Sequence, residues 1–187
     1  METTIIQWNR QIKEIVSNPD SHQENENSGP LDEIQYWRNR RENLKHIDEQ
    51  LENAELKAIV KFLEKMDSND ARGFGELATN IKSKSEEAQN NLLFLESLFE
   101  PCKKLEVAEP KQIPEMIPEL LKRVRMIWHH SKFYKSNERI SGLLYKISNQ
   151  IIQRCKAKIN VDDMLDGDVE KCIEDLNDAI DCGKRWR

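Results

Sequence analysis

The chain has 187 residues, of which 34% are charged and 37% are hydrophobic, and its mean hydropathy is -0.79. This length suits one domain, and the excess of charge favours narrow apolar stripes on charged helices over a thick globular core. The net charge of -5 argues against nucleic acid, and no segment is apolar enough to predict a membrane span or a signal peptide. We therefore expect a soluble intracellular protein with no nucleic-acid or membrane partner.

The N-terminal residues 1–16 predict a short amphipathic helix. Its apolar residues are spaced 3, 4 and 3 apart, which places them on one face: Ile5, Trp8, Ile12 and Ile15. The next segment, 17–29, is polar and contains proline and glycine, so we expect a flexible linker between this helix and the remainder.

A second helix is predicted to begin at Pro30, because proline fits the first helical position, where no amide donor is needed. Its stripe consists of Ile34, Trp37, Leu44, Ile47 and Leu51. Arg41 lies on or beside this stripe, where it either extends its charge to solvent or meets a partner. A third helix carries Leu56, Ile59, Val60, Leu63 and Met66, with Phe62 off its main face.

Residues 67–75, with the sequence DSNDARGFG, predict a turn, and a long helix is expected from Phe74 onward. Its stripe consists of Leu77, Ile81, Ala88, Leu92 and Leu95. Pro101 is expected to end or break this helix. Three further prolines at 110, 114 and 118 predict an irregular joint, with Pro118 at the start of the next helix.

Three apolar stripes in the remainder of the chain each predict a helix. Their members are Ile117, Leu120, Leu121, Val124, Ile127 and Trp128; Ile140, Leu143, Leu144, Ile147, Ile151 and Cys155; and Val169, Cys172, Ile173, Leu176, Ala179 and Ile180. No alternating strand pattern competes with them. We predict an all-α protein, an elongated helical bundle of about six or seven amphipathic helices, with a helical domain at 30–187 that has a joint near 101–118.

His129 and His130 are the residues that first suggest chemistry. Adjacent helical side chains diverge by about 100°, so the two rings do not converge on one metal ion. No close Cys or His spacing predicts a zinc site, and no nucleophile–base or phosphate-binding motif is present. We expect four free thiols, with Cys102 and Cys182 more exposed than Cys155 and Cys172. The sequence predicts no cofactor, no metal and no catalytic residue; a metal enzyme using His129, His130 and Cys155 stays as an alternative.

Tryptophans in charged surroundings are the candidates for a partner interface. Trp8, Trp37 and Trp186 would each be an interface residue if exposed, and otherwise an ordinary packing residue. Arg41 joins them because of its position beside the stripe. Trp128 fits its stripe and is expected in the core or in an interface.

Three stretches together resemble the N-terminal tail region of a dynein heavy chain. They are GPLDEIQYWRNRRENLKHIDEQL at 29–51, AQNNLLFLESLFEPCKKL at 88–105, and a long series at 113–155 that contains IPEMIPELL, MIWHHSKFYKSNERI and ISNQIIQRC and is followed by DGDVEKCIEDL at 166–176. The order and spacing match along nearly the whole chain. The Gly-Pro-Leu opening and the pair Phe133 and Tyr134 look more like axonemal than cytoplasmic heavy chains.

The resemblance implies a non-catalytic helical scaffold that assembles heavy chains with one another and with intermediate and light chains. It implies a much longer parent protein, an ATP-driven motor of the cilium axoneme that contacts microtubules through its other parts. His129 and His130 are not part of the resemblance. A free-standing helical adaptor that binds an amphipathic partner helix is the alternative, because the same stripes would serve it.

Overall fold

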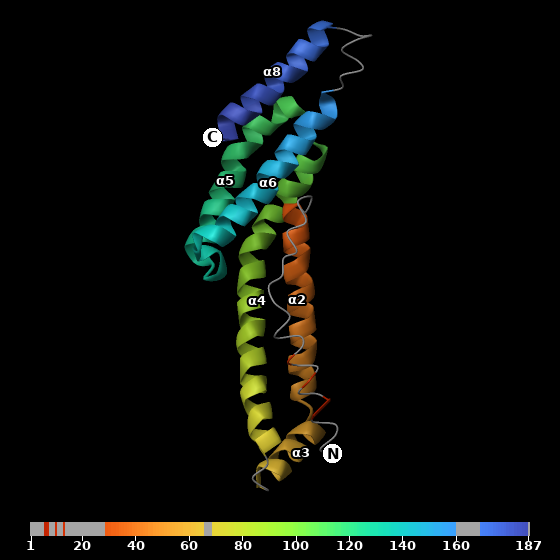
Figure 1. Cartoon of the computed structure of the whole chain (residues 1–187), viewed down its shortest axis with the longest axis vertical. Coiled ribbons are helices and arrows are strands. Elements are labelled where there is room, and N and C mark those ends of the chain that lie inside the picture. The colour runs from red at the N-terminus through yellow and green to blue at the C-terminus, as the bar shows by residue number, and fades with distance from the viewer. Residues whose placement is uncertain are drawn as a thin grey trace. The chain divides into compact units, whose positions relative to one another are not determined.

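The computed structural model describes residues 29–65, 69–159 and 169–186, together with Ile6, Gln7, Arg10 and Lys13. Within these residues every regular element is an α- or 3-10 helix, which confirms the all-α prediction (Figure 1). The predicted stripe of residues 1–16, the linker before residue 29 and Met66 lie outside the described residues. None of the described helices is long and apolar enough to cross a membrane.

The described residues belong to two compact units. The first contains Tyr36–Leu92, and the second contains the start of the second helix, up to Gln35, and Leu93–Arg187. Two helices, α2 (Pro30–Leu51) and α4 (Asn69–Val107), therefore contribute residues to both units. The division of the chain at residues 16, 29 and 101–118 stays a prediction.

The first unit is built from α2, α3 (Ala54–Lys65) and the first part of α4. Its apolar cluster consists of Ile47, Leu51, Phe74 and Ile81, with Leu56, Ile59, Val60, Leu77 and Ala78 packed around it. Phe62 is exposed, as its position off the main face of α3 predicted. The apolar periodicity of all three helices thus leads to a common core.

The start of α4 differs from the sequence prediction. Residues 69–75 were predicted as part of a turn, but α4 already begins at Asn69. Gly73 and Gly75 each disfavour helix by about 1 kcal/mol relative to alanine. Burial of Phe74 and Ile81 in the apolar cluster contributes about 1.5–3 kcal/mol for each side chain, which together offset both glycines. Packing of these two residues therefore outweighs the local turn signal.

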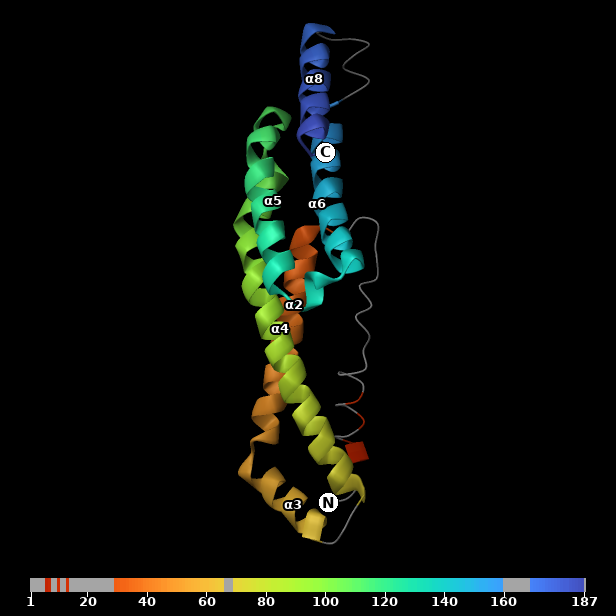
Figure 2. The same cartoon turned by 90° about the vertical axis from the view of Figure 1, so that its left-hand side faces the viewer.

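In the described part of the second unit, the end of α4 is followed by five further elements. They are η1 (Pro110–Gln112), α5 (Ile113–His130), η2 (Phe133–Lys135), α6 (Asn137–Lys158) and α8 (Val169–Trp186). The helices α5 and α6 contact each other, and α8 contacts both of them and η1 (Figure 2). Residues 131–136 form the turn between α5 and α6, and the Ser136 hydroxyl caps α6 by accepting from Arg139 N at 3.4 Å.

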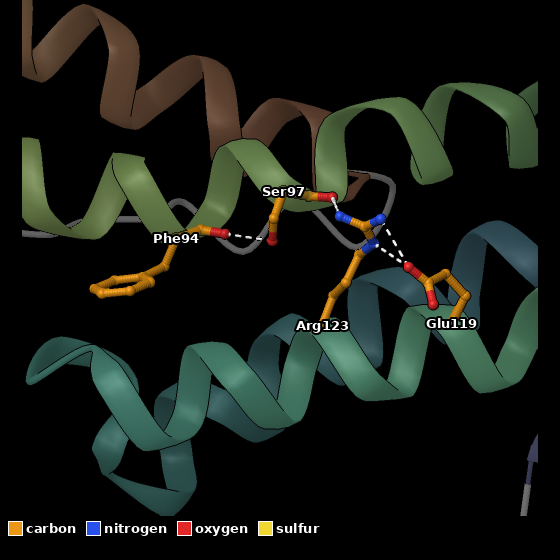
Figure 3. A network of polar contacts seen from close by, with 4 residues as sticks. All are labelled: Phe94, Ser97, Glu119 and Arg123. Atoms are coloured by element: carbon orange, nitrogen blue, oxygen red, sulfur yellow. Dashed lines mark hydrogen bonds and ion pairs between the residues drawn. The ribbon is translucent and has the colours of Figure 1, made fainter.

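Pro101 does not end α4, which continues to Val107. A proline inside a helix lacks the amide that would donate to the carbonyl four residues earlier, here that of Ser97. The guanidinium of Arg123 on α5 replaces this donor, with Nη1 at 2.6 Å from Ser97 O (Figure 3). Glu119 holds the guanidinium through contacts at 2.9 and 2.7 Å. The prediction of a break at Pro101 is thus wrong because a tertiary contact satisfies the orphaned carbonyl.

The start of α5 also differs from the prediction. Pro118 was expected at the beginning of this helix, but α5 begins at Ile113, and Pro114 occupies its first turn. Pro118 lies inside the helix, where proline is unfavourable by about 3 kcal/mol. Burial of Ile113 and Ile117 offsets this penalty, since each such side chain contributes about 1.5–3 kcal/mol.

A candidate partner-binding surface

The histidines that suggested chemistry are held by aromatic neighbours. The His130 ring stacks on Phe94 with centroids 5.6 Å apart, and the His129 ring lies 4.9 Å from that of Trp128. Cys155 is buried on α6 and belongs to neither contact. Within the described part of the chain, no group of three His, Cys, Asp or Glu side chains could hold a metal ion.

The four thiols are free, and burial favours the protonated form of three of them. Burial raises the pKa of Cys102 to about 12, with Glu106 adding to the shift, and burial and the neighbouring Cys155 raise the pKa of Cys182 to about 12. Burial also raises the pKa of Cys155. A thiolate nucleophile needs the opposite shift.

The predicted exposure of two of these thiols is wrong. Cys102 is fully buried because it continues the α4 stripe at the spacing of Leu98 and Leu105. Cys182 is buried because it lies on the edge of α8 that meets η1, where its Sγ donates to Pro110 O at 3.2 Å.

The predicted interface residues have different surroundings in the structure. Trp37 is only 2% exposed and packs edge-to-face on Tyr36 at 5.4 Å, so its side chain supplies packing and offers no surface to a partner. Arg41 and Trp186 are half-buried, and their part in an interface stays a prediction. Trp8 lies outside the described residues.

A buried polar triad in the second unit was missed by the sequence reading. Glu33 in the first turn of α2 accepts a hydrogen bond from the Tyr134 hydroxyl and forms an ion pair with Lys146 Nζ at 2.5 Å. The side chains of Glu33 and Lys146 are only 5% and 12% exposed. The two residues are 113 positions apart along the chain, so no local sequence pattern predicts that they form a pair. The triad joins α2, η2 and α6 within this unit.

The turn between α5 and α6 is fixed from within. The Tyr134 amide donates to the Ser131 hydroxyl at 3.2 Å, and the Arg139 guanidinium lies over the Phe133 ring at 3.6 Å. These contacts hold the Tyr134 hydroxyl in position for Glu33. The triad is therefore a rigid structural anchor, and its three members are largely shielded from solvent.

A groove of ≈ 430 Å³ lies in the first unit, at the end of α2 and between α3 and α4. Leu51, Leu56 and Phe74 contribute its apolar lining, while lysines and carboxylates alternate around it. Two of these, Lys57 and Glu52, pair with each other, and this hydrogen bond lowers the pKa of Glu52. The mixed charge of the rim selects no class of ligand.

Helix α8 exposes an apolar row that the sequence pattern assigned to its buried stripe. Val169, Ile173 and Ile180 are 62%, 54% and 52% exposed, and Leu176 between them is half-buried. The edge of α8 that carries Cys182 faces η1 instead. On α5, Trp128 is likewise 41% exposed, which excludes it from the core. The apolar face of α8 is thus wider than the surface on which it packs.

Acidic side chains accompany this row. Glu170, Glu174 and Asp181 are exposed, and each follows a residue of the apolar row by one position. From Val169 to Asp181 the helix has five carboxylates and one lysine, a net charge of -4. An exposed apolar row with a charged border is typical of a surface that binds another protein.

Residues 1–187 match the family described as "Dynein heavy chain, N-terminal region 1" over their full extent. The chain belongs to the dynein heavy chain family. It is the N-terminal region of a heavy chain, as the resemblance of residues 29–51, 88–105 and 113–155 implied.

The relatives of this heavy-chain region have names that describe them as flagellar, axonemal or ciliary. The chain is 40% identical to the Dynein-1-beta heavy chain, flagellar inner arm I1 complex, of Chlamydomonas reinhardtii over 187 residues, which are 100% of this chain and 4% of the relative. It is 40% identical to mouse Dynein axonemal heavy chain 2 over 79% of its length, covering 3% of that protein. It is 29% identical to the Dynein beta chain, ciliary, of Tripneustes gratilla over its full length, covering 4% of that protein.

The stretches of this heavy-chain region on which the resemblance rests form helices and the turn between two of them. The stretch 113–155 comprises α5, the turn with η2 and most of α6, and it contains both Tyr134 and Lys146 of the buried triad. The stretch 29–51 contains Glu33, the third member. The sequence features recognised as typical of the family thus include the residues that anchor the second unit.

Proposed function

We propose that this chain is a non-catalytic helical scaffold in the tail of an axonemal dynein heavy chain. Its role is to associate with another heavy chain and to bind intermediate and light chains. The single observation that carries this proposal is the family match over residues 1–187, together with relatives named as axonemal, ciliary and flagellar heavy chains. The exposed apolar row of α8 supports a role in binding.

The parent protein in this proposal is an ATP-driven, minus-end-directed microtubule motor for ciliary or flagellar movement. It resides in the cytoskeleton of the cilium, in the axoneme. Microtubule contact and ATP hydrolysis belong to other parts of the heavy chain, since the chain spans only about 4% of the relative that it matches over its full length. The scaffold itself requires no cofactor, nucleic acid or membrane.

The test begins with an antibody raised against the 187-residue chain, used on blots of isolated cilia and of whole-cell lysate. We expect a single band enriched in cilia and far heavier than the 22.0 kDa of this chain. Immunoprecipitation from a salt extract of axonemes should then recover intermediate and light chains, identified by mass spectrometry. A band at 22.0 kDa alone would favour the free-standing helical adaptor. ATP hydrolysis by the purified chain, abolished by a point substitution within it, would refute the scaffold.

A further inference from the structure

The exposed apolar row of α8 has the spacing of a helix–helix contact. Val169, Ile173, Leu176 and Ile180, hereafter the α8 seam, are separated by 4, 3 and 4 residues. This is the alternation by which one helix meets a second helix lying along it. The α8 seam extends over 12 residues, a rise of about 16 Å at 1.5 Å per step, so its occupant needs about three helical turns.

Among the described residues, α8 contacts η1, α5 and α6. Cys182, which is held against Pro110, lies two positions after Ile180 and therefore about 200° round the helix from it, on the side away from the seam. Three of the four seam residues remain more than half exposed. A helix that reaches the α8 seam therefore passes beside Glu170, Glu174 and Asp181. Each of these follows a seam residue by one position, and Leu176 is followed by Asn177.

The charge of this side selects the partner. Three exposed carboxylates, those of Glu170, Glu174 and Asp181, border the seam and give this side a negative potential, whereas Asp175 and Asp178 are half-buried. Asp181 pairs with Lys184 at 3.2 Å, but both side chains are more than 60% exposed, so this pair contributes little and can be exchanged for a partner's cation. Pairing of α8 with a second α8 would oppose two acidic rows, and such like-charge contacts are unfavourable.

We propose that the α8 seam binds an amphipathic helix of another polypeptide whose apolar seam is bordered by lysine or arginine. This inference rests on the proposed scaffold function and specifies the place and the chemistry of one of its contacts. Apolar burial along the seam supplies affinity, and the acidic row supplies charge selectivity and faster association.

The test uses two synthetic helical peptides of about three heptads, both with leucine at the a and d positions. One has lysine at the flanking e and g positions, and the other has glutamate there. Fluorescence anisotropy of each labelled peptide is measured against the 187-residue chain. We expect the lysine peptide to bind at least tenfold more tightly than the glutamate peptide, with a difference that shrinks at high salt. Equal binding of both peptides, or binding of neither, would overturn the proposal.

Substitutions locate the contact. Ile173→Ser should weaken binding of the lysine peptide at least tenfold, whereas Phe62→Ser, at an equally exposed residue of α3, should leave binding unchanged. Glu174→Lys should weaken it several-fold, with Glu86→Lys on α4 as the matched surface control. Circular dichroism confirms that each variant is folded. An Ile173→Ser chain that binds as tightly as the wild type would contradict the assignment of the seam.

Two further measurements separate the alternatives. In sedimentation of the chain alone, we expect the wild type and the Ile173→Ser variant to have the same association state. Association of the wild type that Ile173→Ser abolishes would assign the seam to a second copy of the chain and overturn the proposal. In axonemal pull-downs, the wild-type chain and the Ile173→Ser variant are compared for the dynein subunits that they capture. If both capture the same subunits in equal amounts, the seam assignment is refuted while the scaffold function stands. Wild-type chain that captures no dynein subunit would refute the scaffold function itself.

Discussion

Helices α6 and α8 have similar apolar patterns and different surroundings. In α6, the stripe residues Leu143, Ile147, Ile151 and Cys155 are buried. In α8, the stripe residues Val169, Ile173 and Ile180 are exposed. Both helices lie in the second unit and contact α5 and each other. An apolar row on a helix therefore shows which face can be buried, and the placement of the neighbouring elements decides whether that face is covered.

Polar side chains also join α6 to the elements around it. Side chains of α6 reach the backbone of other elements: Gln150 Nε2 donates to Cys102 O at 3.3 Å, and Arg154 donates to Ala108 O at 3.2 and 3.0 Å. These bonds satisfy carbonyls near the end of α4 and hold α6 in register. On α8, the Cys182 Sγ donates to Pro110 O. We interpret α6 as a structural helix and α8 as a helix that also presents a surface.

The largest expected effect comes from replacing an isoleucine of the stripe by alanine in each of the two helices. Ile147→Ala in α6 removes a fully buried side chain and should lower the free energy of unfolding by about 2–5 kcal/mol. Ile173→Ala in α8 should lower it by less than about 0.5 kcal/mol, because the side chain is already exposed. Urea unfolding followed by circular dichroism measures both. Equal losses would show that the α8 seam is buried in the folded chain.

The buried triad is expected to give the next largest effect. Glu33→Ala leaves Lys146 buried without its carboxylate, which should lower the free energy of unfolding by about 3 kcal/mol. The matched control is Glu49→Ala, which breaks the exposed pair of Lys45 and Glu49 and should cost less than about 1 kcal/mol. Replacing Glu33 and Lys146 together by Gln and Met should recover part of the loss. A Glu33→Ala variant as stable as the control would show that the triad is not an anchor.

Arg123 should show a smaller effect that depends on Pro101. Arg123→Ala leaves Ser97 O without its charged donor and should cost about 1–3 kcal/mol. In a Pro101→Ala background the cost should fall, because the restored amide of residue 101 can donate to the same carbonyl. A double-mutant cycle by urea unfolding measures this coupling, with Arg125→Ala on the exposed face of α5 as control. A coupling of zero would disprove the compensation.

The smallest expected effect is a pH dependence at Cys102. Its pKa is raised from 9.0 to about 12 by burial, so the unfolded chain releases this proton at lower pH than the folded chain does. The stability that this thiol contributes is complete below about pH 9 and is lost as the pH rises towards 12. Between pH 8 and pH 10 the wild type should lose about 1 kcal/mol more than Cys102→Ala. Identical pH profiles of the two would contradict the buried, neutral thiol.

The prolines show which features of the fold can be predicted from local sequence and which cannot. Pro30 begins α2 as predicted, because its effect at a helix start is local. Pro101 and Pro118 were predicted to end and to begin helices, and both lie inside them. Their effect depends on a donor from α5 in one case and on burial of Ile113 and Ile117 in the other. Neither contribution is local, so neither is visible in the sequence.

The sequence by itself determined the all-α class, the helical faces and the family. Each follows from local information: residue spacing at 3.6 per turn, and residue types at fixed separations along 113–155. Only the tertiary structure decided which apolar rows are covered. Trp37 and Ile173 have similar places in their patterns, yet one is buried and the other exposed. Burial depends on which elements meet in space, and contacts such as that between Glu33 and Lys146 join residues that are far apart in the chain.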